Sequence, residues 1–181
     1  MIVIGVAPGL KALTYSVLEI RPSVRPTVID KDVLLGPKLP GRDDEMGFLK
    51  GLVELGKKAY VHHLIMEVVL ERALVPVGHC IARPRGLLVI GPACNPKEPP
   101  EHVMAVRVML RALAGQFGTP SEDMNEAQMQ ALLEPTPRES WFRVANRTID
   151  EPLDTDDRKI VLAVAVSLAG GLRARREGRA L

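Results

Sequence analysis

The residues of this chain that are best suited to chemistry are three aspartates that crowd one short segment. Asp154, Asp156 and Asp157, here called the aspartate cluster, lie directly before an apolar run that predicts a helix. Carboxylate oxygens are the ligands that Mg²⁺ prefers, so the cluster could hold a metal ion. Aspartates at this position also cap a helix and complement the positive end of its dipole. Both interpretations, a helix cap and a relocated metal site, stay open at this point.

Basic residues form a second cluster at the other end of the same predicted helix. Residues 173–181, here called the basic tail, contain four arginines: Arg173, Arg175, Arg176 and Arg179. The formal net charge of +2 is too small to indicate a nucleic-acid-binding protein by itself, so the uneven distribution carries the signal. The tail could bind phosphates electrostatically, or it could be a solvated helix end that favours cations.

Histidine and cysteine give no comparable signal. His62 and His63 are adjacent on a predicted helix, where neighbouring side chains point about 100° apart and cannot hold one ion together. The pair His79-Cys80 lacks a second ligand pair at the spacing of a zinc site. Cys80 and Cys94 do not make a disulfide framework, so we expect a reduced, cytoplasmic protein. No apolar run is long enough to span a bilayer, so we expect no membrane partner.

The elements that position these residues follow from the apolar pattern. The pattern predicts strands over residues 3–7, 13–20, 27–35 and 86–93. It predicts helices over residues 45–73, 101–117, 125–133, 139–148 and 157–175, and a loop over 118–122. With 181 residues, we expect one domain over 1–181 that ends in the basic tail. An antiparallel meander of three strands, followed by helices that alternate with strands, is the order of the ribonuclease H-like α/β fold, a five-stranded mixed sheet flanked by helices.

Four stretches of the sequence resemble RuvC-type Holliday-junction resolvases, in the order of that family. VIGVAPGLKALTYSVLE resembles the first strands, whose pattern is I-x-G-I-D-P-G-x-x-x-x-G-x-G-V-I. RPRGLLVIGPACNPK resembles the fourth strand, HVMAVRVMLRALAGQF the next helix and DDRKIVLAVAVSLAGG the last helix. The resemblance implies DNA as a partner, two-metal nuclease chemistry with Mg²⁺, and a homodimer. We expect the dimer contact on the apolar face of residues 45–73.

The resemblance also implies where the catalytic acids would lie. The first-strand aspartate corresponds to Ala7, the fourth-strand glutamate to Gly91, and the two acids of the last helix to Asp157 and Ile160. These four positions are here called the vestigial site. Neither Ala7 nor Gly91 offers a side-chain oxygen to Mg²⁺. We therefore expect a pseudonuclease with no catalytic residue, no bound metal and no cofactor, unless the aspartate cluster forms a rearranged acid set that binds Mg²⁺ or Mn²⁺.

Three functions remain open from the sequence. The first is a non-catalytic protein that binds branched or duplex DNA through the basic tail, with Lys97 and Arg138 nearer the vestigial site. The second is an active metal-dependent endonuclease that uses the aspartate cluster. The third is a protein-interaction scaffold with no nucleic-acid role. The aromatic residue that the family places against bases corresponds to Cys94, so this wedge is also missing.

Overall fold

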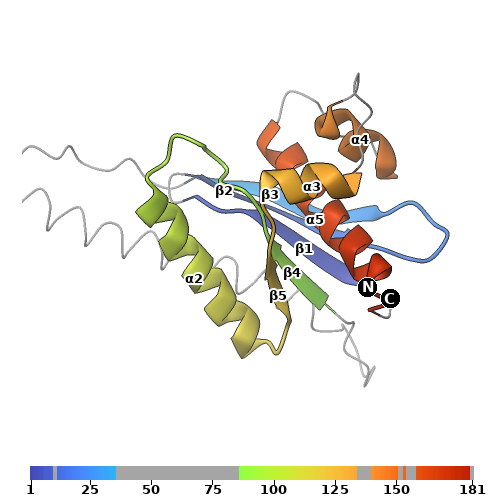
Figure 1. The fold of residues 1–181 in the computed structure, drawn as a ribbon, viewed down its shortest axis with the longest axis horizontal. Helices are drawn as coiled ribbons and strands as arrows, with labels where there is room; N and C mark the ends of the chain where they lie inside the picture. Colours follow the sequence, from blue (N-terminus) through green and yellow to red (C-terminus); the bar gives the residue numbers. More distant parts are fainter. Residues whose placement is uncertain (10–11, 36–85, 134–139, 151–152, 154–157, 180–181) are drawn as a thin grey trace, which may run out of the picture.

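A mixed β-sheet forms the centre of the molecule. The computed structural model describes residues 1–9, 12–35, 86–133, 140–150, 153 and 158–179. Within them, five strands lie in the order β3-β2-β1-β4-β5 (Figure 1). They are β1 (Ile2–Ala7), β2 (Ala12–Glu19), β3 (Thr27–Leu35), β4 (Gly86–Ile90) and β5 (Ser121–Asp123). β1, β2 and β3 pair antiparallel, and β4 lies parallel to both β1 and β5. The predicted five-stranded mixed sheet is confirmed.

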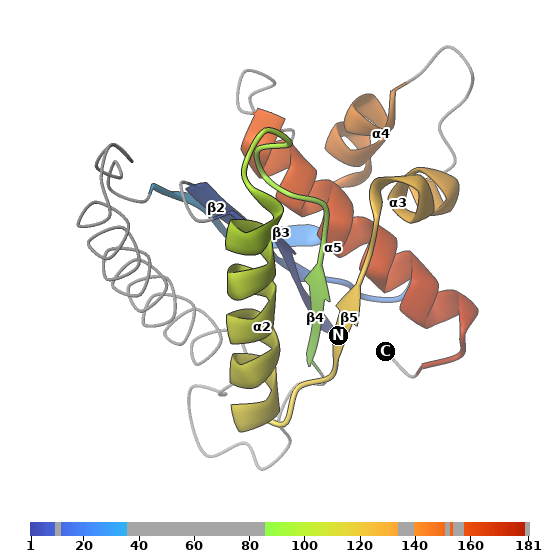
Figure 2. The same ribbon diagram turned by 60° about the vertical axis from the view of Figure 1, so that its left-hand side comes forward.

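Helices cover both faces of this sheet (Figures 1 and 2). The described helices are α2 (Pro100–Gln116), α3 (Glu126–Leu133), α4 (Trp141–Thr148) and α5 (Arg158–Arg176). α2 covers one face, where Val106, Leu110 and Leu113 join apolar residues of β1, β2 and β4. α5 covers the other face, and α3 and α4 pack against α5. Of these four helices, none is long and apolar enough to cross a membrane.

Small residues allow α5 to approach the sheet closely. Gly5 of β1 lies directly beneath α5, and a Cβ atom there would be 2.3 Å from Ser167 Oγ. Ser167 Oγ is also 2.6 Å from Ser16 Oγ of β2, which forms a buried hydrogen bond between helix and sheet. A buried hydroxyl needs such a partner because an unpaired polar group is costly inside a protein. This contact fixes α5 over β1 and so fixes where its first turn lies.

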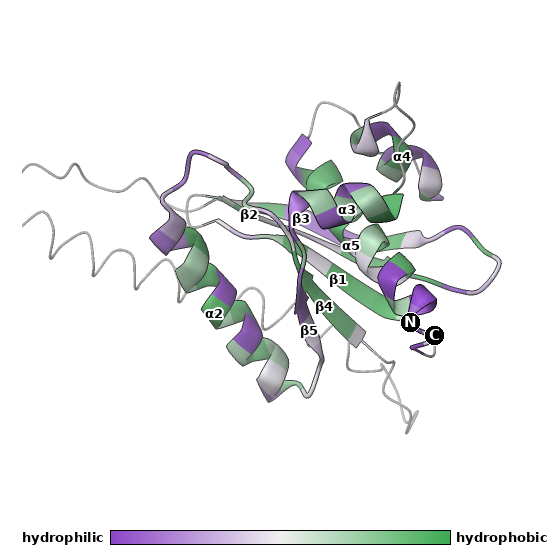
Figure 3. Cartoon of the chain, viewed as in Figure 1, coloured by the Kyte–Doolittle hydropathy of each residue, from purple (hydrophilic) through white to green (hydrophobic). Residues whose placement is uncertain are grey.

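The edge strand β5 is the main difference from the predicted fold. The sequence predicted a loop over residues 118–122, whereas Ser121–Asp123 pair in parallel with Leu88–Ile90 of β4. Figure 3 shows that β5 is hydrophilic, so no apolar pattern marks it in the sequence. β4 also ends at Ile90 rather than at residue 93, because Pro92 has no N–H to extend the ladder.

Several sequence predictions fall outside the described residues. They are the helix over 45–73 with its homodimer contact, Arg138, and the aspartate cluster with Asp157. These points stay predictions.

Candidate functional site

The carboxyl ends of β1 and β4 place Ala7 and Gly91 side by side. The two strands pair in parallel with Val6 opposite Ile90, and the Gly91 N–H donates a hydrogen bond of 2.7 Å to the Val6 carbonyl. The first turn of α5 lies at the same end of the sheet, because Leu162 packs against the cluster around Ala7. Two positions of the vestigial site therefore lie together beside the start of α5.

Apolar side chains surround Ala7. It is fully buried in a small cluster that also contains Ala12, Cys94, Val33 and Leu162. A polar contact of this cluster joins Cys94 Sγ to Thr14 Oγ1 at 3.2 Å. Mg²⁺ needs several hard oxygen ligands in near-octahedral geometry, and a thiol, a hydroxyl and methyl groups do not supply them. The described residues at the tip of β1 do not fit a divalent metal ion.

Gly91 is packed too tightly to carry a side chain. A Cβ atom on Gly91 would lie 2.3 Å from Cγ2 and 3.1 Å from Cγ1 of Val166 on α5. A glutamate at this position would displace Val166 or lift α5 from the sheet. The contact between α5 and the sheet therefore leaves no room for an acidic side chain at Gly91. Restoring acids at Ala7 and Gly91 alone would not rebuild the site, because Val166 must also change.

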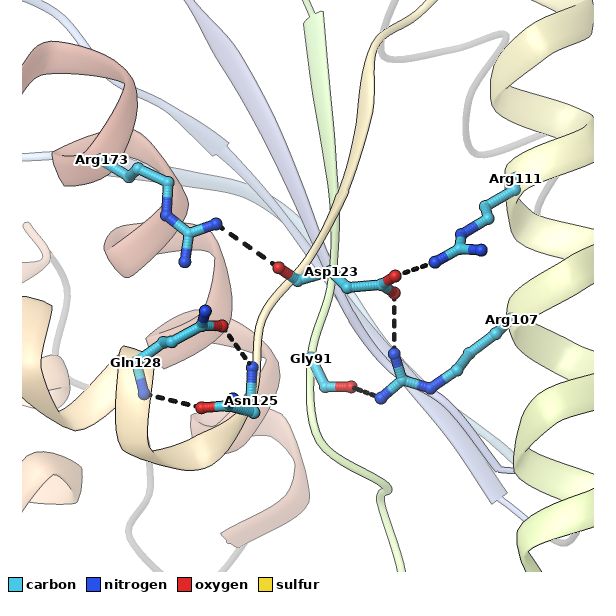
Figure 4. Close-up of polar contacts among 7 residues, drawn as sticks. All are labelled: Gly91, Arg107, Arg111, Asp123, Asn125, Gln128 and Arg173. Atoms are coloured by element: carbon cyan, nitrogen blue, oxygen red, sulfur yellow. Dashed lines mark hydrogen bonds and ion pairs between the residues drawn. The ribbon is translucent and has the colours of Figure 1, made fainter. Parts of the chain in front are cut away.

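The carbonyl group of Gly91 is held from the α2 side (Figure 4). Arg107 donates hydrogen bonds of 2.6 Å to this carbonyl and 2.8 Å to Asp123 Oδ1 of β5. Arg111 also forms an ion pair with Asp123, and Arg173 of α5 donates to the Asp123 carbonyl at 3.4 Å. Burial, and then repulsion from Arg111, lower the pKa of Arg107 from its usual value. This network ties α2, α5 and the β4–β5 edge together.

A buried acid–base pair lies near the turn after β1. The Glu98 side chain is fully buried, and its Oε1 lies 3.9 Å from Nδ1 of His102. A Cβ atom on Gly9 would be 2.6 Å from Glu98 Oε2, so this carboxylate packs against the turn. No motif in the sequence marks either residue. Across the described ranges, no three His, Cys, Asp or Glu side chains gather into a metal site, so this pair does not complete one.

The start of α5 is basic where the family carries acids. Ile160, the second acid position of the last helix, is partly buried and packs against the core that α3, α4 and α5 share. Arg158 and Lys159 precede it and are exposed. Within the described part of this turn, Arg158 and Lys159 are cationic and no side chain is acidic.

A cleft of about 950 Å³ opens between the start of α5, the start of α4 and the segment after β4. The described residues that line it are Pro92, Ala93, Cys94, Pro96, Glu126, Ser140, Trp141, Phe142, Arg143, Arg158, Lys159 and Leu162. Cys94 and Leu162 belong to the apolar cluster around Ala7, so the cleft adjoins the vestigial site. The rings of Trp141 and Phe142 meet edge to face, with centroids 6.0 Å apart.

Most of this cleft has no recognisable motif in the sequence. The signal available there was the tripeptide Trp141-Phe142-Arg143, which contains the single tryptophan of the chain. Lys97, a predicted DNA contact, is exposed next to Pro96 at the edge of the cleft. Its backbone N–H donates a hydrogen bond of 3.1 Å to Asn95 Oδ1.

The basic tail lies at the far end of α5 from the cleft. Arg173 pairs with Glu122 of β5 at 3.4 Å, and Arg179 pairs with both Glu122 and Glu177. The hydrogen bond to Glu122 raises the pKa of Arg179. Arg175 and Arg176 are exposed. Two of the four predicted DNA contacts in the tail thus have a structural role at the β5 edge.

Comparisons with known proteins give a fold. No family model matches the sequence, and no curated protein matches it. RuvC from Thermus thermophilus has a TM-score of 0.72 and 14% identity over 98% of this chain and 97% of its own. The same protein in complex with a Holliday junction substrate has a TM-score of 0.67 and 15% identity, over 99% of this chain and 98% of its own. The yeast mitochondrial Holliday junction resolvase has a TM-score of 0.56 and 12% identity, over 98% of this chain and 82% of its own. The chain has the fold of RuvC-type Holliday junction resolvases, and the resemblance seen in its sequence is confirmed in its structure.

Proposed function

We propose that this chain is a RuvC-like pseudonuclease that binds DNA without cutting it. The observation that carries the proposal is that a basic cleft adjoins the vestigial site, where apolar side chains lie at the positions of the family's acids. The cluster around Ala7 and the contact of Gly91 with Val166 support the loss of metal chemistry. The cations at the cleft support retention of a phosphate ligand.

Charge complementarity favours a polyanion as the ligand of the cleft. Three cationic side chains, Arg143, Arg158 and Lys159, line it against one carboxylate, Glu126, among the described lining residues. Arg143 and Arg158 form no ion pair with another described residue. Contacts of this kind supply most of the sequence-independent affinity of DNA-binding proteins. The junction complex of Thermus thermophilus RuvC makes branched DNA the first ligand to test.

Fluorescence anisotropy with a labelled four-way junction and a matched duplex tests the proposal. We expect binding at low salt that weakens steeply between about 50 and 200 mM salt, with a slope near −0.9 per phosphate contact. No binding to either DNA at low salt would overturn the proposal and favour the scaffold. Incubation of the same junction with Mg²⁺ or Mn²⁺ should leave it intact. Cleavage that Asp157→Asn abolishes would instead establish the nuclease alternative.

A further inference from the structure

The aromatic pair at the cleft is placed to meet a planar ligand. Trp141 and Phe142 are each partly buried, since one side of the pair packs against the core around α5. Both residues also line the cleft. Aromatic rings that the core holds in place can stack on a ligand with little loss of conformational entropy. Cys94, where the family carries its aromatic residue, lines the same cleft.

Cations from two helices line the same cleft as this aromatic pair. Arg143 follows Phe142 directly on α4, and Arg158 and Lys159 begin α5 across the cleft. A ligand that satisfies both groups needs a flat apolar ring and at least one anionic group. A nucleotide has both, and single strands are bound by this combination of a cationic groove and aromatic stacking platforms.

We infer that the cleft binds an unpaired nucleobase together with its flanking phosphates, so that the protein selects single-stranded or unstacked positions within DNA. This inference rests on the proposed function and deepens it. A continuous duplex offers phosphates to the cations, but its bases are stacked and cannot reach Trp141. Unpaired bases expose their faces, so the aromatic pair adds affinity only for them. Trp141 and Phe142 then supply a stacking surface beside Cys94.

The single tryptophan makes the inference directly measurable in the unmodified protein. An oligothymidylate of about 12 nucleotides, within the range of known single-strand sites, should quench the fluorescence of Trp141 and saturate. A duplex at equal occupancy, judged by anisotropy, should quench it much less. Binding of both DNAs with unchanged tryptophan emission would overturn the inference and leave the proposed function standing. If neither DNA binds, both proposals fail.

Matched variants separate stacking from charge. Trp141→Ala should weaken oligothymidylate binding by about 5- to 150-fold and leave duplex binding nearly unchanged, because stacking contributes per exposed base. Trp141→Phe should retain most of the affinity. Phe117→Ala, which removes an aromatic ring outside the cleft, is the control. Because Trp141 also packs against the core, each variant is first checked for an unchanged circular dichroism spectrum. Equal losses for single strand and duplex in a folded Trp141→Ala protein would contradict the inference.

Discussion

The two ends of α5 carry the same kind of side chain in opposite surroundings. At its start, Arg158 is exposed at an open cleft and forms no ion pair with another described residue. At its end, Arg173 and Arg179 share the carboxylate of Glu122 on β5. With a rise of roughly 1.5 Å per residue, the two groups are separated by more than about 20 Å along the helix.

Among the described residues, this difference separates arginines that already share a carboxylate from one that does not. The basic tail has the higher density of arginine in the sequence, but β5 supplies an anion that occupies two of its guanidinium groups. The start of α5 has fewer cations, and the acids that would accompany them in the family are absent at Ala7, Gly91 and Ile160. The proposed function therefore predicts that the start of α5, rather than the basic tail, meets phosphates.

The largest expected effect tests the packing at the start of α5. Gly91→Glu should destabilise the fold by about 3 kcal/mol or more, because it overpacks Val166 and buries a carboxylate. A chain of this size should then melt roughly 10 °C lower. Thermal unfolding followed by circular dichroism measures the shift. Adding Val166→Ala to this variant should recover part of the loss.

Gly115→Glu is the matched control for this variant. Nothing lies within 4 Å of a Cβ atom at Gly115 on α2, so this change should stay within about 0.5 kcal/mol. Gly91→Glu with unchanged stability would show that α5 does not hold this position closed.

The second effect tests which end of α5 meets DNA. Arg143→Ala combined with Arg158→Ala should lower duplex affinity by about tenfold or more and reduce the salt slope by about 0.9 for each lost contact. Arg175→Ala, at the exposed end of the helix, should have little effect. Anisotropy titrations at several salt concentrations give both quantities. A larger loss for Arg175→Ala would reverse the comparison and return the DNA site to the basic tail.

The fold was largely predictable from the sequence because its apolar pattern is strong. β1 and β4 are buried runs of Val, Ile and Leu, and the last helix has a long apolar stretch, so each was placed within a few residues. β5 was missed because Ser121–Asp123 are polar and depend on pairing with β4 for their conformation. A strand that is set by its neighbour leaves no periodic signal of its own.

The site was only partly predictable, for a different reason. The sequence motif predicts that Ala7 and Gly91 lie at neighbouring strand ends, and the pairing of β1 with β4 places them there. The cleft joins Trp141 on α4, Arg158 on α5 and Pro92 after β4, which are far apart in the sequence. Likewise, the pairing of Arg173 with Glu122 depends on β5, which was not expected. Both the lining of the cleft and the pairing of Arg173 depend on neighbours in the folded structure rather than on residue type.

A smaller effect is expected when the carboxylate at the far end of α5 is removed. Glu122→Gln should cost about 1 kcal/mol, the scale of a partly exposed ion pair, and lower the melting temperature by roughly 2–4 °C. The released guanidinium groups of Arg173 and Arg179 should then strengthen DNA binding at low salt. Quenching of Trp141 by oligothymidylate should not change, because the cleft lies at the other end. Unchanged DNA affinity would show that the tail does not meet phosphates even when released.

The smallest expected effect is that of divalent metal ions, which should not change the stability of the protein at all. If the protein had a Mn²⁺ site, Mn²⁺ at about 100 times its dissociation constant would stabilise the fold by about 2.7 kcal/mol. The melting temperature would then rise by roughly 5–10 °C. The apolar cluster around Ala7 and the contact of Gly91 with Val166 offer no oxygen ligands to a metal ion. Melting curves with Mn²⁺, Mg²⁺ or a chelator should therefore coincide. A rise that Asp157→Asn abolishes would place a metal at the aspartate cluster and overturn the pseudonuclease proposal. A rise that Asp157→Asn leaves intact, but Glu98→Gln abolishes, would place the ion beside the buried Glu98–His102 pair instead. In the first case the start of α5 would serve a cation as well as a phosphate, and the contrast between its two ends would no longer rest on the loss of acids.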